Sequence, residues 1–367
     1  MTELGEGSVP LDPASLQQGW PQPSRPRPIV IFGAGSIVND AHLPAYRKAG
    51  FPVAGLYDPD VEKARAIAAR WDVEVFASAE EAAAVEGAIF DLATPPAAHA
   101  RILAVLPEGA YALIQKPMGA DLDAATGILA LCRQRKLHAA VNFQLRFAPM
   151  MLALQDAIRR GLLGDVVDID AHLALSTPWS LWPFLKGLPR IEIAMHSIHY
   201  LDLVRGLIGD PAGIHAKTMG HPNHHVAQTR TSAILDYGDT IRCTLSIHHD
   251  QDFGRMFQVS EFRICGTKGA AYVKLGVNLD YPKGEPDELW IFPAGGDRWI
   301  EIPLQGTWFP DAFIGRMANL QRFASGEDET LVGAVDDAWR TMALVEAAYQ
   351  SSAQPATPVR PLPEAWR

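Results

Sequence analysis

A lysine near the middle of the sequence stands where a side chain can do chemistry. Lys116 follows the apolar run Tyr111–Gln115, and Pro117 cannot continue a strand. We therefore expect the lysine at the carboxyl end of a strand, the edge at which open α/β sheets bind ligands. There its cation can bind a substrate hydroxyl and stabilise a developing alkoxide, while burial lowers its pKa toward a value suited to proton transfer. The Lys116–Pro117 bond is a candidate for the cis form; an ordinary solvated lysine is the alternative.

A second group of reactive side chains lies in Ile191–Asp202, which we expect to be helical. At about 100° of rotation per residue, Glu192, His196 and His199 fall within about 60° of one another. One helix face then carries a carboxylate and two imidazoles, which can relay protons or bind a metal. We expect no metal site, because no other segment has complementary ligand spacing; a structural role for both histidines is a further alternative. Five other histidines are interpreted as structural or exposed: His221, His224, His225, His248 and His249.

Aromatic and basic side chains precede this helix, in Trp179–Arg190. Rings such as Trp179 and Trp182 stack on the apolar faces of sugars, and Lys186 and Arg190 can bind an anionic group. Core packing of the rings is the alternative. The combination favours a carbohydrate substrate, with an acidic or sulfonated sugar as a specific candidate.

A dinucleotide signal lies near the N-terminus, where the apolar run Ile29–Phe32 leads through Gly33-Ala34-Gly35 into an expected helix. The two glycines allow a tight turn and a close backbone approach, and the helix N-terminus attracts a pyrophosphate. Val38 stands where the full G-x-G-x-x-G/A pattern has a small residue, so an ordinary glycine turn is the alternative. The residues expected at the pyrophosphate are Gly33, Gly35, Ser36 and Ile37.

An acidic residue follows at the distance that a dinucleotide site requires. Asp58 ends the expected strand Val53–Tyr57, 20 residues beyond the third position of the glycine pattern. Its carboxylate can accept hydrogen bonds from the adenosine ribose and would repel the 2′-phosphate of NADP, so the expected cofactor is NAD. Capping of the next helix is the alternative. The turn at Thr94-Pro95, after the expected strand Ala88–Ala93, is expected to border the nicotinamide.

The elements that position these residues change in character along the chain. From Ile29 to Phe143, short strands and helices alternate, including an expected strand at Val73–Phe76, which predicts a doubly wound parallel sheet (Rossmann fold) with helices on both faces. After Phe147, strand patterns joined by short turns predict an α/β domain with a large, open, mainly antiparallel sheet and helices on one face. The expected parts are a disordered or loosely docked Pro-rich extension (1–27), an NAD-binding domain (28–147), a substrate-binding and oligomerisation domain (148–353) and a Pro-rich tail (354–367).

Composition limits the remaining classes of function. The 367 residues have a net charge of −10 and no basic block, which argues against nucleic acid and anionic membranes as partners. The three cysteines are scattered, the N-terminus has no apolar leader, and no apolar run is long enough to span a membrane. These features predict a soluble cytoplasmic protein with free thiols.

Several motifs together resemble the Gfo/Idh/MocA oxidoreductases, the family of glucose–fructose oxidoreductase and inositol dehydrogenases. The matching segments are Ala41–Ala45, Ala93–His99, Gln115–Pro117, Asn142–Phe147, His199–Asp202, Gly266–Gly269 and Trp308–Phe313. The resemblance implies a Rossmann domain, an open-faced domain that assembles homo-oligomers (a dimer or tetramer) through its sheet, and a catalytic pair, Lys116 and His199. On the matched motifs we assign cofactor contacts to Thr94, Pro95, His99, Gln115 and Lys116, and a substrate contact to Arg146.

One position departs from the pattern of that family. Its members usually have an aspartate four residues before the histidine, where this chain has Met195. A thioether cannot orient an imidazole through a strong hydrogen bond, so Glu192 or His196 is the expected substitute.

Three functions compete on these observations. The first is an NAD-dependent sugar dehydrogenase, in which His199 removes the hydroxyl proton while Lys116 polarises the oxygen. The second is a redox-neutral glycosidase that oxidises a sugar hydroxyl transiently, eliminates the aglycone, adds water and returns the hydride. That reaction needs additional acid/base groups, for which Glu192 and His196 are candidates, and a sulfoquinovoside is a candidate substrate. The third is a non-catalytic sugar or NAD sensor, motivated by Met195.

Overall fold

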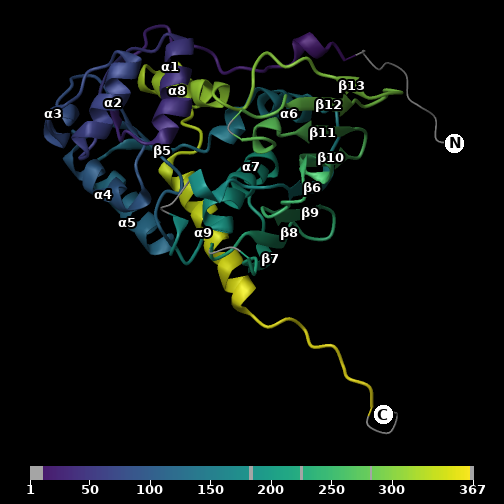
Figure 1. The fold of residues 1–367 in the computed structure, drawn as a ribbon. Coiled ribbons are helices and arrows are strands. Elements are labelled where there is room, and N and C mark those ends of the chain that lie inside the picture. The colour runs from purple at the N-terminus through teal and green to yellow at the C-terminus, as the bar shows by residue number, and fades with distance from the viewer. Residues whose placement is uncertain (1–10, 182–184, 224–225, 282, 364–367) are drawn as a thin grey trace.

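The computed structural model describes residues 11–181, 185–223, 226–281 and 283–363, which form two lobes with the long helix α9 (Val335–Ala353) between them (Figure 1). The first lobe contains a parallel sheet in the order β2-β1-β3-β4-β5. Its strands are β1 (Ile29–Phe32), β2 (Val53–Tyr57), β3 (Ile89–Leu92), β4 (Tyr111–Ile114) and β5 (His138–Val141). The helices between them are α1 (Leu43–Ala49), α2 (Val61–Trp71), α3 (Ala79–Ala83), α4 (Pro96–Val105) and α5 (Leu122–Gln134).

Both faces of this first sheet are buried, as a parallel sheet requires. Ile29 and Ile31 pack with side chains of α1 and α8 (Asp311–Ala324), whereas Val30 and Phe32 pack with side chains of α4 and α5. The expected Rossmann fold is therefore confirmed. Since α8 comes from the far end of the chain, the expected boundary at residue 147 does not separate two independent cores.

One expected strand is wrong. Within Val73–Phe76, only Val75 forms a β-bridge, to Leu56 at the outer edge of β2. The amide of Leu56 donates to the Glu74 carbonyl over 2.9 Å, and the amide of Phe76 donates to the Leu56 carbonyl over 2.9 Å. The chain then turns into α3, so pairing stops after a single residue pair.

The second lobe is built on a sheet in the order β13-β12-β11-β10-β6-β9-β8-β7. Every neighbouring pair in it is antiparallel except β6 and β9, which run parallel, so the expected mainly antiparallel sheet is confirmed. Its strands are β6 (Val166–Ala174), β7 (Gly213–Met219), β8 (Arg230–Asp236), β9 (Arg242–His248), β10 (Val259–Gly266), β11 (Ala270–Lys274), β12 (Glu288–Phe292) and β13 (Ile300–Glu301).

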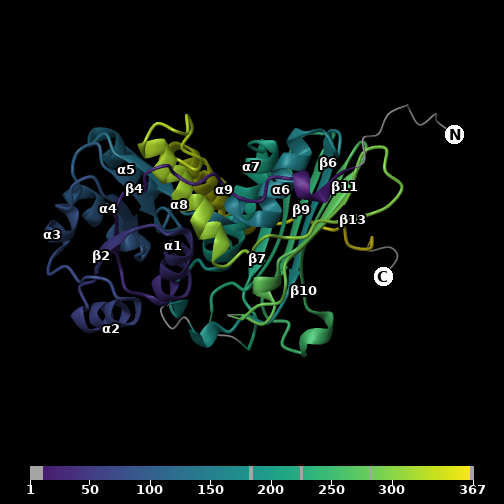
Figure 2. The ribbon, with the colours of Figure 1, turned by 90° about the horizontal axis from the view of Figure 1, so that it is seen from above.

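Three helices cover the face of this sheet that looks toward the first lobe: α6 (Pro149–Arg159), α7 (Ile198–Ile208) and α9 (Figure 2). The opposite face lies on the outside of the described chain (Figure 2). Helix α7 is preceded by a π-helical turn, η6 (Glu192–Ser197), where the sequence predicts regular helix. A π turn is rare and is found most often at functional sites.

The segment 11–27, which we call the N-terminal strap, is packed rather than disordered, and the sequence expectation is wrong for these residues (Figure 2). Leu16 and Gln18 are buried, and the Gln18 side chain bonds to the backbone of the loop before α8. The indole of Trp20 donates to Asp328 over 2.7 Å, and its ring lies 5.2 Å from that of Phe147. The strap thus runs across both lobes, and its side chains Leu11, Leu16 and Trp20 pack against the core clusters.

A buried ion pair ties the start of the second lobe to α7, and its loss is expected to destabilise the fold. Arg146 Nε and Nη2 lie 2.6 and 2.7 Å from the carboxylate of Asp202. Asp202→Asn should cost about 3 kcal/mol, because the guanidinium then keeps only Asp337 as a counter-charge inside the protein. The measurement is the urea unfolding midpoint. The matched control is Asp168→Asn, which breaks the exposed Arg242 pair and should leave the midpoint nearly unchanged; equal shifts for both variants would contradict the prediction.

Candidate active site

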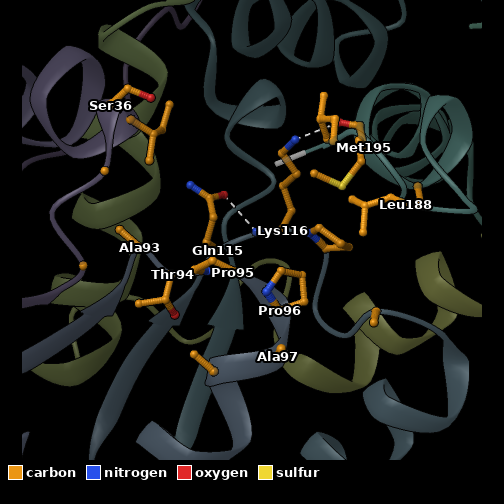
Figure 3. A pocket seen from close by; sticks show the side chains of 18 of the residues that line it. Ser36, Ala93, Thr94, Pro95, Pro96, Ala97, Gln115, Lys116, Leu188 and Met195 are labelled. Atoms are coloured by element: carbon orange, nitrogen blue, oxygen red, sulfur yellow. Dashed lines mark hydrogen bonds between the residues drawn. The ribbon is translucent and has the colours of Figure 1, made fainter. Parts of the chain in front are cut away.

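A pocket of about 1710 Å³ lies between the two lobes. Its walls include the carboxyl ends of β1 and β4, the turn η6, and the loops that follow β6 and β9. Figure 3 shows Ser36 at one side of this pocket, Lys116 in the middle and Met195 at the other side. The glycine turn and the reactive lysine therefore share one cavity, as the sequence predicts for a dinucleotide enzyme.

At the first end of the pocket, the glycine turn has the geometry of a phosphate cradle. Gly33 has a φ of +113°, and a Cβ there would lie 2.4 Å from the carbonyl oxygen of Ala93. A Cβ on Gly35 would meet nothing within 4 Å, so the backbone faces open space in the pocket. The helical turn that begins at Ser36 directs its N-terminus to the same space. This cradle fits the pyrophosphate of a dinucleotide.

Asp58 is also where a dinucleotide needs it, and it is linked to the glycine turn. Its carboxylate accepts hydrogen bonds from the backbone amides of Ala34 and Asp60, each with a donor–acceptor distance of 2.8 Å. These two bonds fix the carboxylate at the pocket wall. The expected cofactor residues that line the pocket are Gly33, Gly35, Ser36, Ile37, Asp58, Thr94, Pro95, Gln115 and Lys116.

His99 is the exception, and its assignment as a cofactor contact is wrong. The residue is fully buried, and its two ring nitrogens lie 3.0 Å from the carbonyl oxygens of Met118 and Thr94. The imidazole joins the turn after β3 to the turn after β4. His99 therefore supports the pocket wall from behind.

Gln115 positions the backbone of the reactive lysine through a buried network. Its Oε1 accepts a hydrogen bond from the Lys116 amide over 2.8 Å, and its Nε2 lies 3.4 Å from His42 Nε2 (Figure 3). His42 Nδ1 in turn lies 2.6 Å from Asp91 Oδ2, and Tyr46 donates to the same oxygen over 2.6 Å. The Gln115 side-chain amide is thus held from both ends.

Lys116 reaches across the pocket to the second lobe. Its Nζ donates to the backbone carbonyl of Met195 over 2.7 Å, and the Lys116–Pro117 bond is cis (Figure 3). Burial lowers the pKa of Lys116 to about 8. Burial, and then the charge of Lys116, lower the pKa of His199 well below its usual range. At neutral pH the pocket therefore holds a cationic donor and a neutral imidazole, which are the two groups that hydroxyl oxidation needs.

The lowered pKa of Lys116 predicts that a reaction relying on its cation slows on the alkaline side. The protonated lysine is the form that can donate to a ligand oxygen, and its population halves near pH 8 rather than near the ordinary value of about 10.4. If the pocket oxidises a hydroxyl with NAD, kcat/KM at saturating NAD should decline above about pH 8. Lys116→Arg should extend the plateau to higher pH, because a guanidinium keeps its proton. A wild-type profile that still rises at pH 9.5 (about 1.5 units above the lysine midpoint) would contradict this assignment.

Next to this pair, two further imidazoles stack inside the pocket. The rings of His196 and His249 lie 4.5 Å apart at an angle of 47°, and both residues line the cavity. Glu192 stands behind them: it is fully buried, and its Oε1 lies 3.4 Å from His249 Nε2 and 2.7 Å from Ser197 Oγ. His249 was expected to be structural or exposed; it is buried and has structural contacts, and in addition it lines the pocket. Glu192 was assigned to catalysis, but the structure places its carboxylate outside the pocket wall.

The residues expected to bind an anionic sugar are not brought together. Arg146 is bound to Asp202 outside the pocket, so its assignment as a substrate contact is wrong. Lys186 is exposed and does not line the pocket. Arg190 lines it but is paired with Glu346 at 2.5 Å.

The two tryptophans of the same segment have separate outcomes. Trp179 packs its ring edge against His196, with the ring centroids 5.5 Å apart, and its Nε1 donates to Asp250 over 3.3 Å. It supports the pocket without being one of the residues that line it. Trp182, together with His224 and His225, lies outside the described residues.

Several pocket residues were missed in the sequence: Gln144, Thr177, His249, Asn278 and Trp308. Thr177 and His249 follow β6 and β9, and because these strands are parallel their carboxyl ends meet at one edge. Thr177 Oγ1 lies 2.8 Å from His249 Nδ1. A prediction of that parallel pair would have found both residues.

Two absences apply to the described part of the chain. Among the described residues, no group of three or more His, Cys, Asp or Glu side chains is arranged to hold a metal ion. Within the same residues, no helix has the length and apolar character needed to cross a bilayer.

Comparison with known families gives two matches along the chain. A model of an oxidoreductase family with an NAD-binding Rossmann fold matches residues 27–143. A model of the GFO/IDH/MocA C-terminal domain matches residues 151–272. The first model matches a segment of the first lobe and the second a segment of the second lobe.

Characterised relatives and solved structures extend this likeness over most of the chain. D-apiose dehydrogenase of Paraburkholderia graminis is 24% identical over 340 residues, which cover 88% of this chain and 86% of that protein. An Agrobacterium radiobacter oxidoreductase solved with NAD+, L-tartaric acid and magnesium has a TM-score of 0.73 at 22% identity, covering 90% of this chain and 97% of that one. The WlbA dehydrogenase of Bordetella pertussis, solved with NADH and UDP-GlcNAcA, has a TM-score of 0.69 at 19% identity, covering 89% and 97%. At these identities the two structures show a shared fold.

Proposed function

Since this chain belongs to the Gfo/Idh/MocA family of oxidoreductases, whose first domain binds NAD, we propose that it oxidises a secondary hydroxyl of a sugar or related polyol. The observation that supports this most is the meeting of Lys116 and His199 in the pocket that also contains the glycine turn. The likeness to a D-apiose dehydrogenase over 88% of the chain supports a carbohydrate as substrate. The residues that would hold NAD are the pocket-lining set around Gly33, Gly35 and Asp58.

The chain's own groups divide the chemistry between them. Lys116, held by the Met195 carbonyl, donates a hydrogen bond to the substrate oxygen and stabilises its negative charge. His199 is neutral, and its Nδ1 is buried without a hydrogen-bond partner among the described residues, so the ring can accept the hydroxyl proton. Bound NAD supplies the hydride acceptor. The Met195 carbonyl orients the lysine, whereas none of the described residues takes the place of the missing aspartate at His199 Nδ1.

The test is a panel of neutral sugars, polyols and sugar acids mixed with NAD, with NADH formation followed by absorbance. We expect at least one neutral sugar or polyol to be oxidised, and Lys186→Ala to leave the rate unchanged because that lysine is outside the pocket. A protein that binds NAD but oxidises no compound of the panel would contradict the proposal.

A redox-neutral glycosidase is the second candidate, and one observation favours it. The pocket holds two imidazoles, His196 and His249, beyond the pair that a dehydrogenase needs. Release of nitrophenol from nitrophenyl glycosides, dependent on NAD but without net NADH, would establish this reaction and exclude a simple dehydrogenase.

Assembly through the outer face of the second sheet is proposed as well. Ile234 and Trp299 are 53% and 46% exposed, and the three helices that cover this sheet lie on its other face (Figure 2). Burial of such side chains favours a dimer or tetramer. Light scattering would measure the mass, and a monomer at micromolar concentration would contradict it.

A further inference from the structure

One pocket residue has no role in the proposed oxidation, and its surroundings indicate a role of its own. His196 lines the cavity, and its Nε2 is buried without a hydrogen-bond partner among the described residues. An unpaired polar atom inside a protein costs free energy unless something binds to it. The ring nitrogen is therefore available to a ligand rather than to the protein.

The position of the His196 ring is fixed by two aromatic neighbours. Trp179 meets it edge-on, with centroids 5.5 Å apart and an interplanar angle of 89°, and His249 lies 4.5 Å away on another side. Such ring contacts favour one orientation over free rotation. A recognition group held in one orientation loses little conformational entropy when a ligand binds.

A chain of buried polar contacts lies behind the His196 and His249 rings. Thr177 Oγ1 lies 2.8 Å from His249 Nδ1, and Glu192 Oε1 lies 3.4 Å from His249 Nε2. Ser197 then donates to Glu192 over 2.7 Å. His249 Nδ1 is thus paired with Thr177, and its Nε2, although without a hydrogen bond, lies beside the Glu192 carboxylate. His196 Nε2 has no such neighbour among the described residues, so His196 is the imidazole of the pair that is better placed to bind substrate.

The chemistry of the His196 ring fits a hydroxyl group. Burial, followed by the neighbouring His249, Lys116 and His199, lowers the pKa of His196 well below its usual range. The neutral ring has one donor and one acceptor, and a hydroxyl also donates and accepts. A neutral ring offers an anionic substituent only a single uncharged donor.

The place of His196 relative to the reaction centre defines which hydroxyl it meets. The preceding residue, Met195, supplies the carbonyl that binds Lys116, and His199 is three residues further along the same helical segment. We propose that His196 binds a second hydroxyl of the substrate, beside the one that is oxidised, so that the enzyme selects compounds with vicinal hydroxyl groups. This inference rests on the proposed function.

The experiment combines a protein change with a matching substrate change. The best sugar or polyol of the panel and its singly deoxygenated analogues are compared on the wild type and on His196→Ala. For the wild type, loss of the neighbouring hydroxyl should lower kcat/KM at least about 30-fold, because a site built to bind a hydroxyl rejects a compound without it. His196→Ala should lose a similar factor with the parent compound and less than about 3-fold with the deoxy analogue, so that the two changes are coupled.

Two further variants serve as controls for this test. His196→Gln keeps a donor and an acceptor and should recover part of the discrimination, whereas Lys186→Ala, at an exposed position outside the pocket, should change nothing. Equal losses for parent and deoxy compounds in both His196 variants would overturn the inference. If the wild type forms no NADH at all, the proposed function fails. Calorimetric binding of the same two compounds in the presence of NADH then tests the role of His196 alone. Equal affinities of the wild type for both compounds would overturn the inference about His196.

Discussion

Lys116→Met should lower kcat for hydroxyl oxidation by about 10³-fold while leaving NAD affinity within about 3-fold. Methionine keeps most of the length and apolar volume of the side chain but removes the donor that stabilises the charged oxygen, and loss of one such donor costs roughly 10²–10³-fold in kcat. The hydrogen bond from Nζ to Met195 shows that the amine lies on the substrate side of the pocket, away from the glycine turn. The measurements are steady-state kinetics and calorimetric titration with NAD.

Two controls make this expectation specific. Lys186→Met changes an exposed lysine outside the pocket and should retain the full rate. Lys116→Arg keeps the charge in a different shape and should retain intermediate activity. Retention of more than a tenth of the wild-type kcat (about 1.4 kcal/mol of barrier) by Lys116→Met would remove the lysine from the mechanism.

The cofactor half of the pocket was predictable because its determinants are local in sequence. The apolar run, the two glycines and the helical segment that follows lie within the 21 residues from Ile29 to Ala49. Lys116 was found for the same reason: an apolar run that stops at a proline defines the end of a strand. His99 was misassigned because position in a motif does not reveal which way a side chain points, and here it points to two carbonyl oxygens.

The substrate half was less predictable because it depends on contacts between distant segments. Arg190 and Arg146 look like anion-binding residues in the sequence, but Glu346 and Asp202 neutralise them across separations of 156 and 56 residues. His249 enters the pocket only because β9 pairs in parallel with β6. Charge compensation and strand order are properties of the folded chain, so a pattern of residue types cannot show them.

Dependence on distant segments also explains why the strap and the packing of helix α8 on the first sheet were not predicted. Proline-rich composition predicts disorder, yet residues 11–27 bury Leu16 and bond Trp20 to Asp328, more than 300 residues away in the chain. Helix α8 likewise returns to pack against the first sheet. In both cases the partner surface is formed by the other end of the protein.

Gly33→Ala should destabilise the protein by about 3 kcal/mol and abolish measurable NAD binding. The φ of +113° is in a region that residues with a side chain rarely adopt, which costs roughly 1–3 kcal/mol. The new Cβ would also lie 2.4 Å from the Ala93 carbonyl oxygen, which is backbone and cannot rotate away. The turn must then shift. The hydrogen bond from the Ala34 amide to Asp58 and the start of the helix at Ser36 shift with it. Urea unfolding and calorimetric titration with NAD measure the two effects.

Two other glycines separate backbone strain from loss of the ligand. Gly35→Ala puts a methyl group into open space without a positive φ, so the fold should keep its stability while NAD binding weakens, because the pyrophosphate then cannot approach the backbone closely. Gly127→Ala, at an exposed position inside α5, should stabilise the fold by about 0.5–1 kcal/mol and leave NAD binding unchanged. If Gly33→Ala matched Gly35→Ala in stability, the strained turn would not be a structural requirement. If Gly35→Ala bound NAD normally, the pyrophosphate would lie elsewhere in the pocket.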